Sequence, residues 1–134
     1  MEVLLVLAIL MAGLGIGLPA YNKFTVQKEE DQFFQLLRND IYYAQSEAYL
    51  RDTSVTLIFR PNSDRYDVYH TIKSYLVSRA VPDSVTPIGS SNLTQIVFGS
   101  TGSISKSGTL KFITSSGERT VIVHLGKGRV VISE

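Results

Sequence analysis

The 134-residue sequence contains no cysteine and two histidines. The absence of cysteine excludes disulfides, thiolate metal sites and a cysteine nucleophile, but it does not identify a compartment, because a small exported domain can be stable without disulfides. His70 and His124 lie far apart, and neither belongs to a His-x-x-His pair or an acidic cluster. We therefore expect no metal site and no cofactor, and we expect both histidines to be ordinary strand residues.

Acidic residues are also missing from one long part of the sequence. The net charge is +1 and the pI is near 8.0, so composition alone indicates neither a nucleic acid nor an acidic partner. No acidic residue occurs between Asp83 and Glu118. Scattered solvating charge is the preferred interpretation of the basic residues here, and a weakly basic face is the alternative. These residues are Lys106, Lys111, Arg119, Lys127 and Arg129.

The longest uncharged stretch comes first, because no charged side chain lies between Glu2 and Lys23, and residues 3–18 are all apolar. This run predicts a membrane helix of roughly 24 Å, short of the ~30 Å hydrocarbon core. A secretory signal peptide would need a basic leader and a small-residue cleavage site, and the sequence shows neither. We expect either partial insertion or a true front end that precedes Met1.

Glycine and proline are absent between Ala20 and Pro61, and residues 21–52 carry apolar residues at spacings of three, four and seven. This pattern predicts an amphipathic helix with one buried face. The predicted stripe contains Val26, Phe33, Leu37, Ile41, Ala44 and Ala48, widened by Phe34, Leu36, Tyr42 and Tyr43. The charged residues are expected on most of the remaining surface, namely Lys28, Glu29, Glu30, Asp31, Arg38, Asp40, Glu47 and Arg51.

The two helical patterns join without a break, which predicts one helix from Glu2 to about Arg51. Such a helix would be roughly 75 Å long, so its front half must project from the body. Pro19 inside it removes a backbone hydrogen bond and should kink it. Beyond Asp52 the period changes to two, and turn residues recur every eight to twelve positions.

The predicted fold class is α+β: a long kinked N-terminal helix, with an apolar projecting front half, packs by its rear half on an antiparallel β domain of six or seven strands. The expected strands cover residues 54–60, 65–69, 74–81, 93–98, 108–113, 120–125 and 129–132, with residues 82–92 as a loop. The expected division is residues 1–19 as the anchoring half-helix and 20–134 as the globular domain, with its helix over 20–52 and its β domain over 53–134.

Three further motifs favour structure over chemistry. Ser100, Ser103, Ser105 and Ser107 accompany glycines but lack a G-x-S-x-G elbow, so they indicate turns. Residues 126–129, Gly-Lys-Gly-Arg, lie between two strands and predict a hairpin turn in preference to a phosphate site. Tyrosines could stack on single-stranded DNA, but strand and core positions explain them better. These tyrosines are Tyr42, Tyr43, Tyr66, Tyr69 and Tyr75.

The motifs bring together no acid, base and nucleophile, so we expect that the protein is not an enzyme.

The order of these features resembles the type IV pilin and type II secretion pseudopilin superfamily. Glu2 begins the apolar helix, Pro19 stands at the family's distance from that glutamate, and an amphipathic helix and a β domain follow. Residues 96–98 followed by Gly102, and then residues 108–110, look like GspH/FimT-type minor pseudopilins. Residues 121–132 are similar to the end of ComGD-type competence pseudopilins of Gram-positive DNA-uptake systems.

The resemblance implies roles for particular residues. Glu2 would meet the N-terminal amine of a neighbouring subunit and set the register of assembly, and Pro19 would kink the helix. Gly13 and Gly17 form a G-x-x-x-G, which would either allow close helix packing or only add flexibility. In the family a basic leader and a Phe-Thr segment precede the glutamate, and we expect both upstream of Met1. The alternative is a protein that prepilin peptidase cannot process.

The resemblance also implies partners and a location. The partners would be other pilin subunits, the cell membrane before assembly, and prepilin peptidase, which would process and methylate the precursor. The chain would cross the membrane once with its β domain outside, and then join a surface filament. The first hypothesis is a minor pseudopilin of a competence pilus. The alternative is an H-type pseudopilin of type II secretion, and the third is a DNA-binding subunit at a pilus tip.

Overall fold

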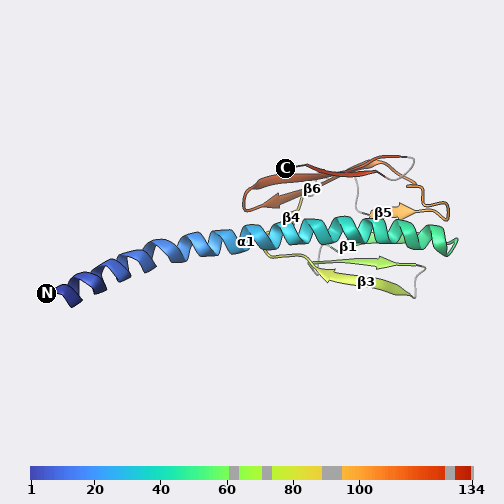
Figure 1. Ribbon diagram of the computed structural model, residues 1–134. Coiled ribbons are helices and arrows are strands. Elements are labelled where there is room, and N and C mark those ends of the chain that lie inside the picture. Colours follow the sequence, from blue (N-terminus) through green and yellow to red (C-terminus); the bar gives the residue numbers. More distant parts are fainter. Residues whose placement is uncertain (61–63, 71–73, 89–94, 126–128, 134) are drawn as a thin grey trace.

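The computed structural model describes residues 1–60, 64–70, 74–88, 95–125 and 129–133, and within the first helix the side chains of residues 16–19 lie outside this description. In these ranges one helix, α1 (Glu2–Leu50), precedes eight strands. Figure 1 shows the rear half of α1 lying along both sheets, while its front half projects beyond them. The predicted fold class and the projecting half-helix are therefore confirmed.

The helix ends where the sequence changes from helix formers to β-branched residues. The amide of Arg51 donates to the Glu47 carbonyl, and the amide of Thr53 donates to the Ala48 carbonyl at 3.2 Å. Between them Asp52 has a φ of 51°, in the left-handed region that Asp tolerates better than most residues. This pattern of bonds is a common helix terminus and turns the chain into the first strand.

The strands form two antiparallel sheets of four strands each, in the orders β3-β2-β1-β5 and β4-β6-β7-β8. Hairpins join β1 to β2, with Phe59 opposite Tyr66, and β6 to β7, with Phe112 opposite Arg119. Their bounds are β1 Val55–Arg60, β2 Arg65–Tyr69, β3 Tyr75–Ala80, β4 Thr86–Pro87, β5 Gln95–Phe98, β6 Gly108–Thr114, β7 Gly117–Val123 and β8 Val130–Ser133.

The seven predicted strands all correspond to observed ones, and β4 is the addition. Thr86 and Pro87 pair with Ile113 and Phe112 at the edge of the second sheet, so the prediction that residues 82–92 form only a loop is wrong. The predicted turns at residues 61–63 and 126–128 lie outside the described residues.

An aromatic cluster joins the helix to both sheets. The ring of Phe33 on α1 lies 6.0 Å from that of Tyr66 and 6.3 Å from that of Phe112, centroid to centroid. Phe34 and Phe59 also contact Phe112, at 5.7 and 5.4 Å. Edge-to-face and tilted pairs of this kind add stabilisation beyond the buried area. The core therefore lies between the rear half of α1 and the inner faces of the two sheets.

The buried face of α1 differs from the predicted stripe in two respects. Leu36, Tyr42 and Tyr43 are 41%, 39% and 42% exposed, so the prediction that they widen the stripe is wrong. Glu30 and Asp40, predicted on the solvated surface, are 0% and 4% exposed. The physical reason is helical spacing, because the buried series 30, 33, 37, 40, 44 and 48 advances by three and four residues along one face.

Candidate assembly helix and its anchoring contacts

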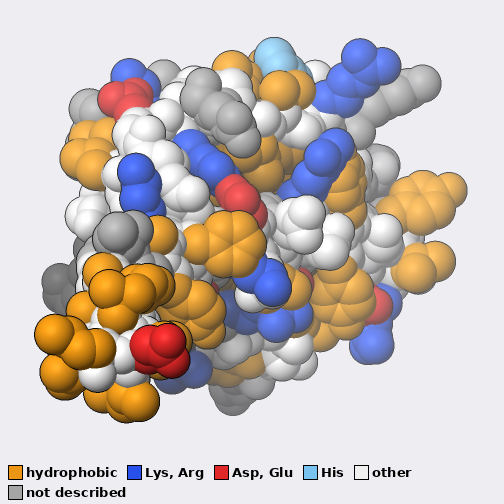
Figure 2. Space-filling view, turned by 60° about the vertical axis from the view of Figure 1, so that its left-hand side comes forward, with side chains coloured by type: hydrophobic (Ala, Val, Ile, Leu, Met, Phe, Trp, Pro, Cys, Tyr) orange, Lys and Arg blue, Asp and Glu red, His pale blue; other side chains and the backbone are white. Residues whose placement is uncertain are grey.

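The front half of α1 has no covering partner in the described molecule. Its apolar side chains are highly exposed, with Val3 at 72% and Leu10 at 59%. It is long and apolar enough to cross a membrane, and none of its most apolar stretch is buried. Figure 2, in which this end comes forward, shows apolar side chains gathered over the projecting tip. Exposure of this much apolar surface to water is unfavourable.

Glu2 lies in the first turn of α1, where the helix dipole favours a negative charge. Among the described residues no side chain forms an ion pair with it. A methyl group added at Gly13 would meet nothing within 4 Å, so this glycine packs against nothing inside the chain. The backbones of Gly17 and Pro19 are helical, and their packing and kink remain predictions because their surroundings lie outside the described residues.

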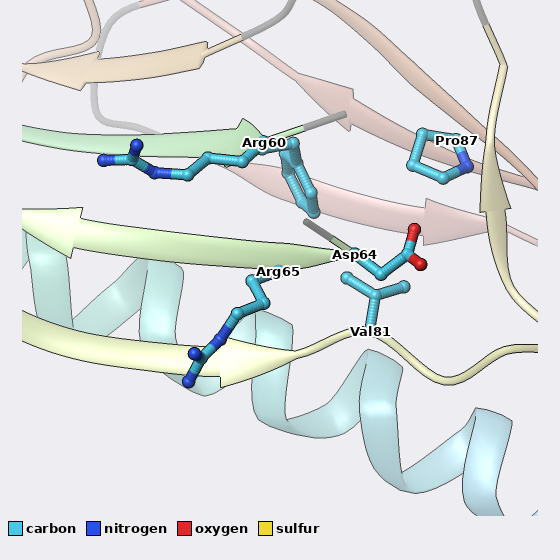
Figure 3. Close-up of a pocket in the computed structure, with 6 residues that line it drawn as sticks. Arg60, Asp64, Arg65, Val81 and Pro87 are labelled. Atoms are coloured by element: carbon cyan, nitrogen blue, oxygen red, sulfur yellow. The ribbon is translucent and has the colours of Figure 1, made fainter. Parts of the chain in front are cut away.

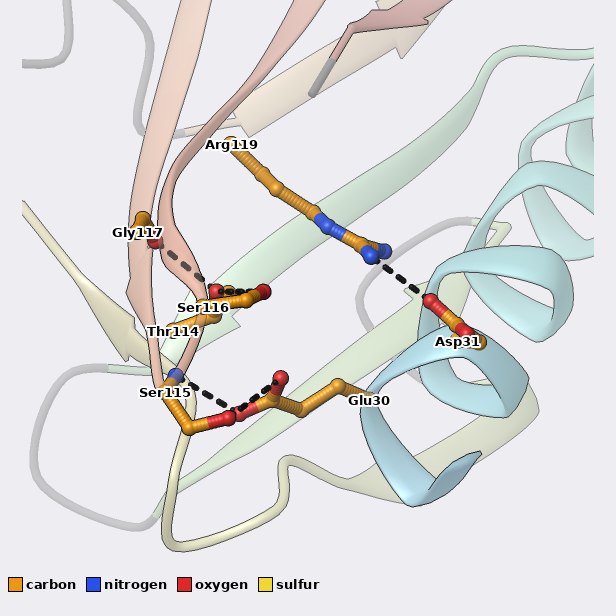
Figure 4. A network of polar contacts seen from close by, with 7 residues as sticks. All are labelled: Glu30, Asp31, Thr114, Ser115, Ser116, Gly117 and Arg119. Carbon is orange, nitrogen blue, oxygen red and sulfur yellow. Dashed lines mark hydrogen bonds and ion pairs between the residues drawn. The ribbon is translucent and has the colours of Figure 1, made fainter. Parts of the chain in front are cut away.

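Two acidic residues attach the middle of α1 to the second sheet, as Figure 4 shows. Glu30 accepts hydrogen bonds from the backbone amide and the hydroxyl of Ser115, at 2.8 and 3.0 Å. The next residue, Asp31, accepts a hydrogen bond from Arg119 at 2.6 Å. The Arg119 guanidinium also lies 4.9 Å from the centre of the Phe34 ring. Glu30 is fully buried, so its carboxylate depends on these bonds for solvation.

A third acidic residue attaches α1 to the first sheet. Asp40 accepts from the Tyr66 hydroxyl at 2.5 Å and from Arg79 Nε at 2.6 Å. Burial, and then the hydrogen bond to Asp40, raise the pKa of the Tyr66 hydroxyl far above its usual value. The same carboxylate, through its hydrogen bond, raises the pKa of Arg79. The Asp40 carboxylate therefore interacts with one cationic side chain, Arg79, and with one neutral phenol, Tyr66.

Polar contacts continue to the end of the helix. Gln45 Nε2 donates to the Gly102 carbonyl at 2.9 Å, and Gly102 itself adopts a φ of 77°. Glu47 pairs with Arg51 at 2.8 Å and lies 3.6 Å from His70 Nε2. All of these contacts involve the rear half of α1, which explains how one helix can be fixed at one end and free at the other.

The histidines and tyrosines that the sequence analysis considered as candidate site residues lie in separate parts of the fold. His70 follows β2 and His124 follows β7, so the prediction that both are strand residues is wrong by one position in each case, because each strand ends just before its histidine. No group of three or more metal-ligating side chains occurs within the described residues. Tyr66 is in the core as predicted, whereas Tyr42, Tyr43 and Tyr75 are exposed.

The surface hollows seen among the described residues include one beside the first sheet. One small pocket is lined by Phe59, Arg60, Asp64, Arg65, Val81 and Pro87. Figure 3 shows the guanidinium groups of Arg60 and Arg65 directed away from Val81 and Pro87. Arg60 instead donates to Asp67 at 2.5 Å and to the Tyr75 hydroxyl at 3.1 Å, on the outside of the first sheet. The described side chains around this pocket offer a carboxylate but no neighbouring base or nucleophile.

Sequence reasoning missed the anchoring acids and their partners. The burial of Glu30 and Asp40 could have been predicted, because both lie at three- or four-residue spacing from residues of the apolar stripe. Their partners were not readable, since Ser115 lies 85 residues from Glu30 and Arg79 lies 39 residues from Asp40.

A projecting helix with a two-sheet β domain along its rear half is the architecture of pilins and pseudopilins, and solved structures of that class are similar to this chain. The type IV minor pilin FimU of Pseudomonas aeruginosa superimposes with a TM-score of 0.66 at 14% identity, covering 83% of this chain and 92% of that chain. The minor pseudopilin EpsH from the type 2 secretion system of Vibrio cholerae gives a TM-score of 0.60 at 12% identity, covering 78% and 96%.

The family itself is shown by sequence. A family model described as type II transport protein GspH matches residues 34–127, most of the globular domain. The chain therefore belongs to the GspH family, within the type IV pilin and type II secretion pseudopilin superfamily. A search of curated proteins gives no significant match to this chain.

Proposed function

We propose that this protein is a minor pseudopilin of a competence pilus that takes up DNA. The front half of α1 anchors it in the cell membrane until it is assembled into the filament. The observation that carries the proposal is an uncovered apolar half-helix on a folded domain. Lipid covers it before assembly, and the apolar helices of neighbouring subunits cover it afterwards. It has a structural role, and its partners are other pilin subunits.

Glu2 controls assembly in this proposal. A carboxylate at the edge of an apolar segment is costly unless it is paired or kept near water. Because no described residue of its own chain pairs with Glu2, the N-terminal amine of a neighbouring subunit is the natural partner. That pairing neutralises both charges inside the filament and fixes the axial position of the incoming helix.

The test compares Glu2→Ala with Glu29→Ala, a matched change at an exposed acid farther along the same helix. We expect Glu2→Ala to leave the circular dichroism and unfolding of the β domain unchanged while strongly lowering the amount of protein in sheared filaments. Glu29→Ala should assemble normally. Wild-type levels of Glu2→Ala in filaments would contradict the proposed role.

The competence assignment rests on the resemblance of residues 121–132 to competence pseudopilins, and the alternative is an H-type pseudopilin of type II secretion. The alternative is favoured by the family description and by the fold shared with EpsH. Deletion of the gene separates the two, since loss of transformation with normal protein secretion supports the first and the reverse supports the second. Prepilin peptidase is expected to process the precursor in both.

A DNA-contacting role at a pilus tip is motivated by the basic residues of the C-terminal part, such as Lys106, and by exposed tyrosines such as Tyr42 and Tyr75. Filter binding of the full chain in detergent at rising salt tests it. Affinity that falls steeply with salt would favour DNA contact, and absence of binding at low salt would remove it.

A further inference from the structure

Residues 20–29 of α1 lie between the apolar run and the first described buried position of the helix, and all of them are exposed except residues 25–27, which are half-buried. Tyr21 and Phe24 are 67% and 64% exposed, and Lys23 and Lys28 are exposed as well. Glu30 is the first fully buried residue among the side chains of the helix that the structure describes. Two aromatic rings and two lysines at the end of an apolar run are the composition of helix segments at a membrane surface.

Length gives a second, independent reason for this assignment. Residues 3–18 alone span roughly 24 Å, less than the ~30 Å hydrocarbon core. If the segment continues to Phe24, it spans about 33 Å, which matches the core and reaches the interface. The shortfall of the apolar run disappears once Tyr21 and Phe24 form its outer boundary.

The position of the β domain agrees with that boundary. Glu30, which the β6–β7 turn binds through Ser115, lies six residues beyond Phe24, or about 9 Å along the helix. The headgroup layer on one side of a bilayer is about 5–8 Å thick. The β domain would therefore begin at the level of the headgroups, through which residues 24–29 pass with positions 25–27 half-buried.

Charge selects the kind of lipid. Neither Lys23 nor Lys28 has an acidic partner among the described residues. Of the nearby acids, Glu30 is buried on Ser115 and Asp31 is paired with Arg119, so Glu29 is the one exposed acid left without an ion pair in residues 20–31 as described. Lysines at a membrane surface attract anionic lipids, and each contributes a modest part of the binding.

We propose that Tyr21, Lys23, Phe24 and Lys28 form an interfacial belt that binds anionic phospholipid headgroups at the outer face of the membrane. The inference rests on the proposed membrane anchoring, and it adds a depth for the helix and a lipid preference. The belt holds the unassembled subunit with its β domain against the membrane surface. Tyr21, Phe24 and Lys28 follow one another at three- and four-residue spacing and share one face of the helix.

The test uses single tryptophan reporters, because the chain has no tryptophan of its own. The full chain is reconstituted in phosphatidylcholine vesicles with or without phosphatidylglycerol, and quenching by lipids brominated at shallow or deep acyl positions is measured. The reporters are Ile9→Trp within the apolar run, Phe24→Trp in the belt and Tyr43→Trp beside the β domain. We expect deep quenching at position 9, shallow quenching at 24 and none at 43.

Lipid preference is measured on Lys23→Gln/Lys28→Gln, with Lys106→Gln on the β domain as the control. Each lysine removed should lower the enrichment of phosphatidylglycerol around Phe24→Trp by about fivefold at low salt. Lys106→Gln should leave it unchanged.

The outcomes separate the two proposals. Absence of quenching at position 9 would overturn membrane anchoring itself. Deep quenching at position 9 together with no quenching at 24 would overturn the belt while leaving the anchoring intact. Unchanged lipid enrichment after removal of both lysines would overturn the lipid preference.

Discussion

Asp40 offers the sharpest test of how α1 is fixed to the β domain. Asp40→Ala removes the acceptor of two groups with different surroundings. The Tyr66 hydroxyl is fully buried and would be left without a partner, which costs about 1–3 kcal/mol. The side chain of Arg79 is 40% exposed, so water can replace the lost carboxylate. The loss of this ion pair therefore adds only about 0–1 kcal/mol to the destabilisation. We expect a total destabilisation of about 1–4 kcal/mol.

The measurement is urea unfolding of the full chain in detergent micelles, followed by circular dichroism. The midpoint should fall with little change in the slope, because the variant alters the stability and not the surface exposed on unfolding. Asp31→Ala is the matched control on the same helix. Its carboxylate is 58% exposed but its partner Arg119 is only 13% exposed, so the loss of this bond should cost about 1 kcal/mol, less than the loss of the buried Asp40. Equal effects of the two variants would refute the reasoning from burial.

Three further predictions concern the same domain. Above about pH 10 the unfolded chain loses the Tyr66 proton while the folded chain keeps it, so stability is full below pH 10 and then falls by at most about 1.4 kcal/mol per pH unit. Urea unfolding between pH 9 and 11 should show this slope in the wild type and a weaker one in Tyr66→Phe. Glu30→Ala should cost about 1–2 kcal/mol because the exposed Ser115 loses two bonds to a carboxylate and can be partly rehydrated, whereas Glu29→Ala should be nearly neutral. Gly102→Ala should cost about 1 kcal/mol because of its φ of 77°, although its neighbours lie at 3.6 Å or more from an added methyl, and thermal unfolding measures it.

The helix and most of the strands could be predicted because their signals are local. The absence of charge over residues 3–18, the three- and four-residue spacing after Val26, and the alternation around Leu57 each reflect which side chains meet water. β4 escaped prediction because it is two residues long and contains Pro87, which has no amide to donate. Its pairing depends on Phe112 and Ile113, which follow it by more than twenty residues.

The errors on α1 have a different cause. Leu36, Tyr42 and Tyr43 were assigned to the stripe by residue type, and their angular positions place them on the outer face. Glu30 and Asp40 were assigned to solvent by residue type, although the stripe passes through them. Hydropathy describes an average environment, whereas a buried carboxylate depends on one specific donor, and that donor comes from a distant strand.

The contacts of α1 divide the helix into two parts that should respond differently to substitution. Glu2 contributes nothing to the folded domain, so Glu2→Ala should change assembly and leave unfolding unchanged. Asp40 lies in the domain, so Asp40→Ala should lower stability and should reduce assembly only in proportion to the unfolded fraction. If Asp40→Ala remained folded at the assay temperature and still failed to enter filaments, the Asp40 contact would have to position the projecting half-helix as well as stabilise the domain. Assembly measured beside unfolding for both variants therefore shows whether the two parts of α1 are independent.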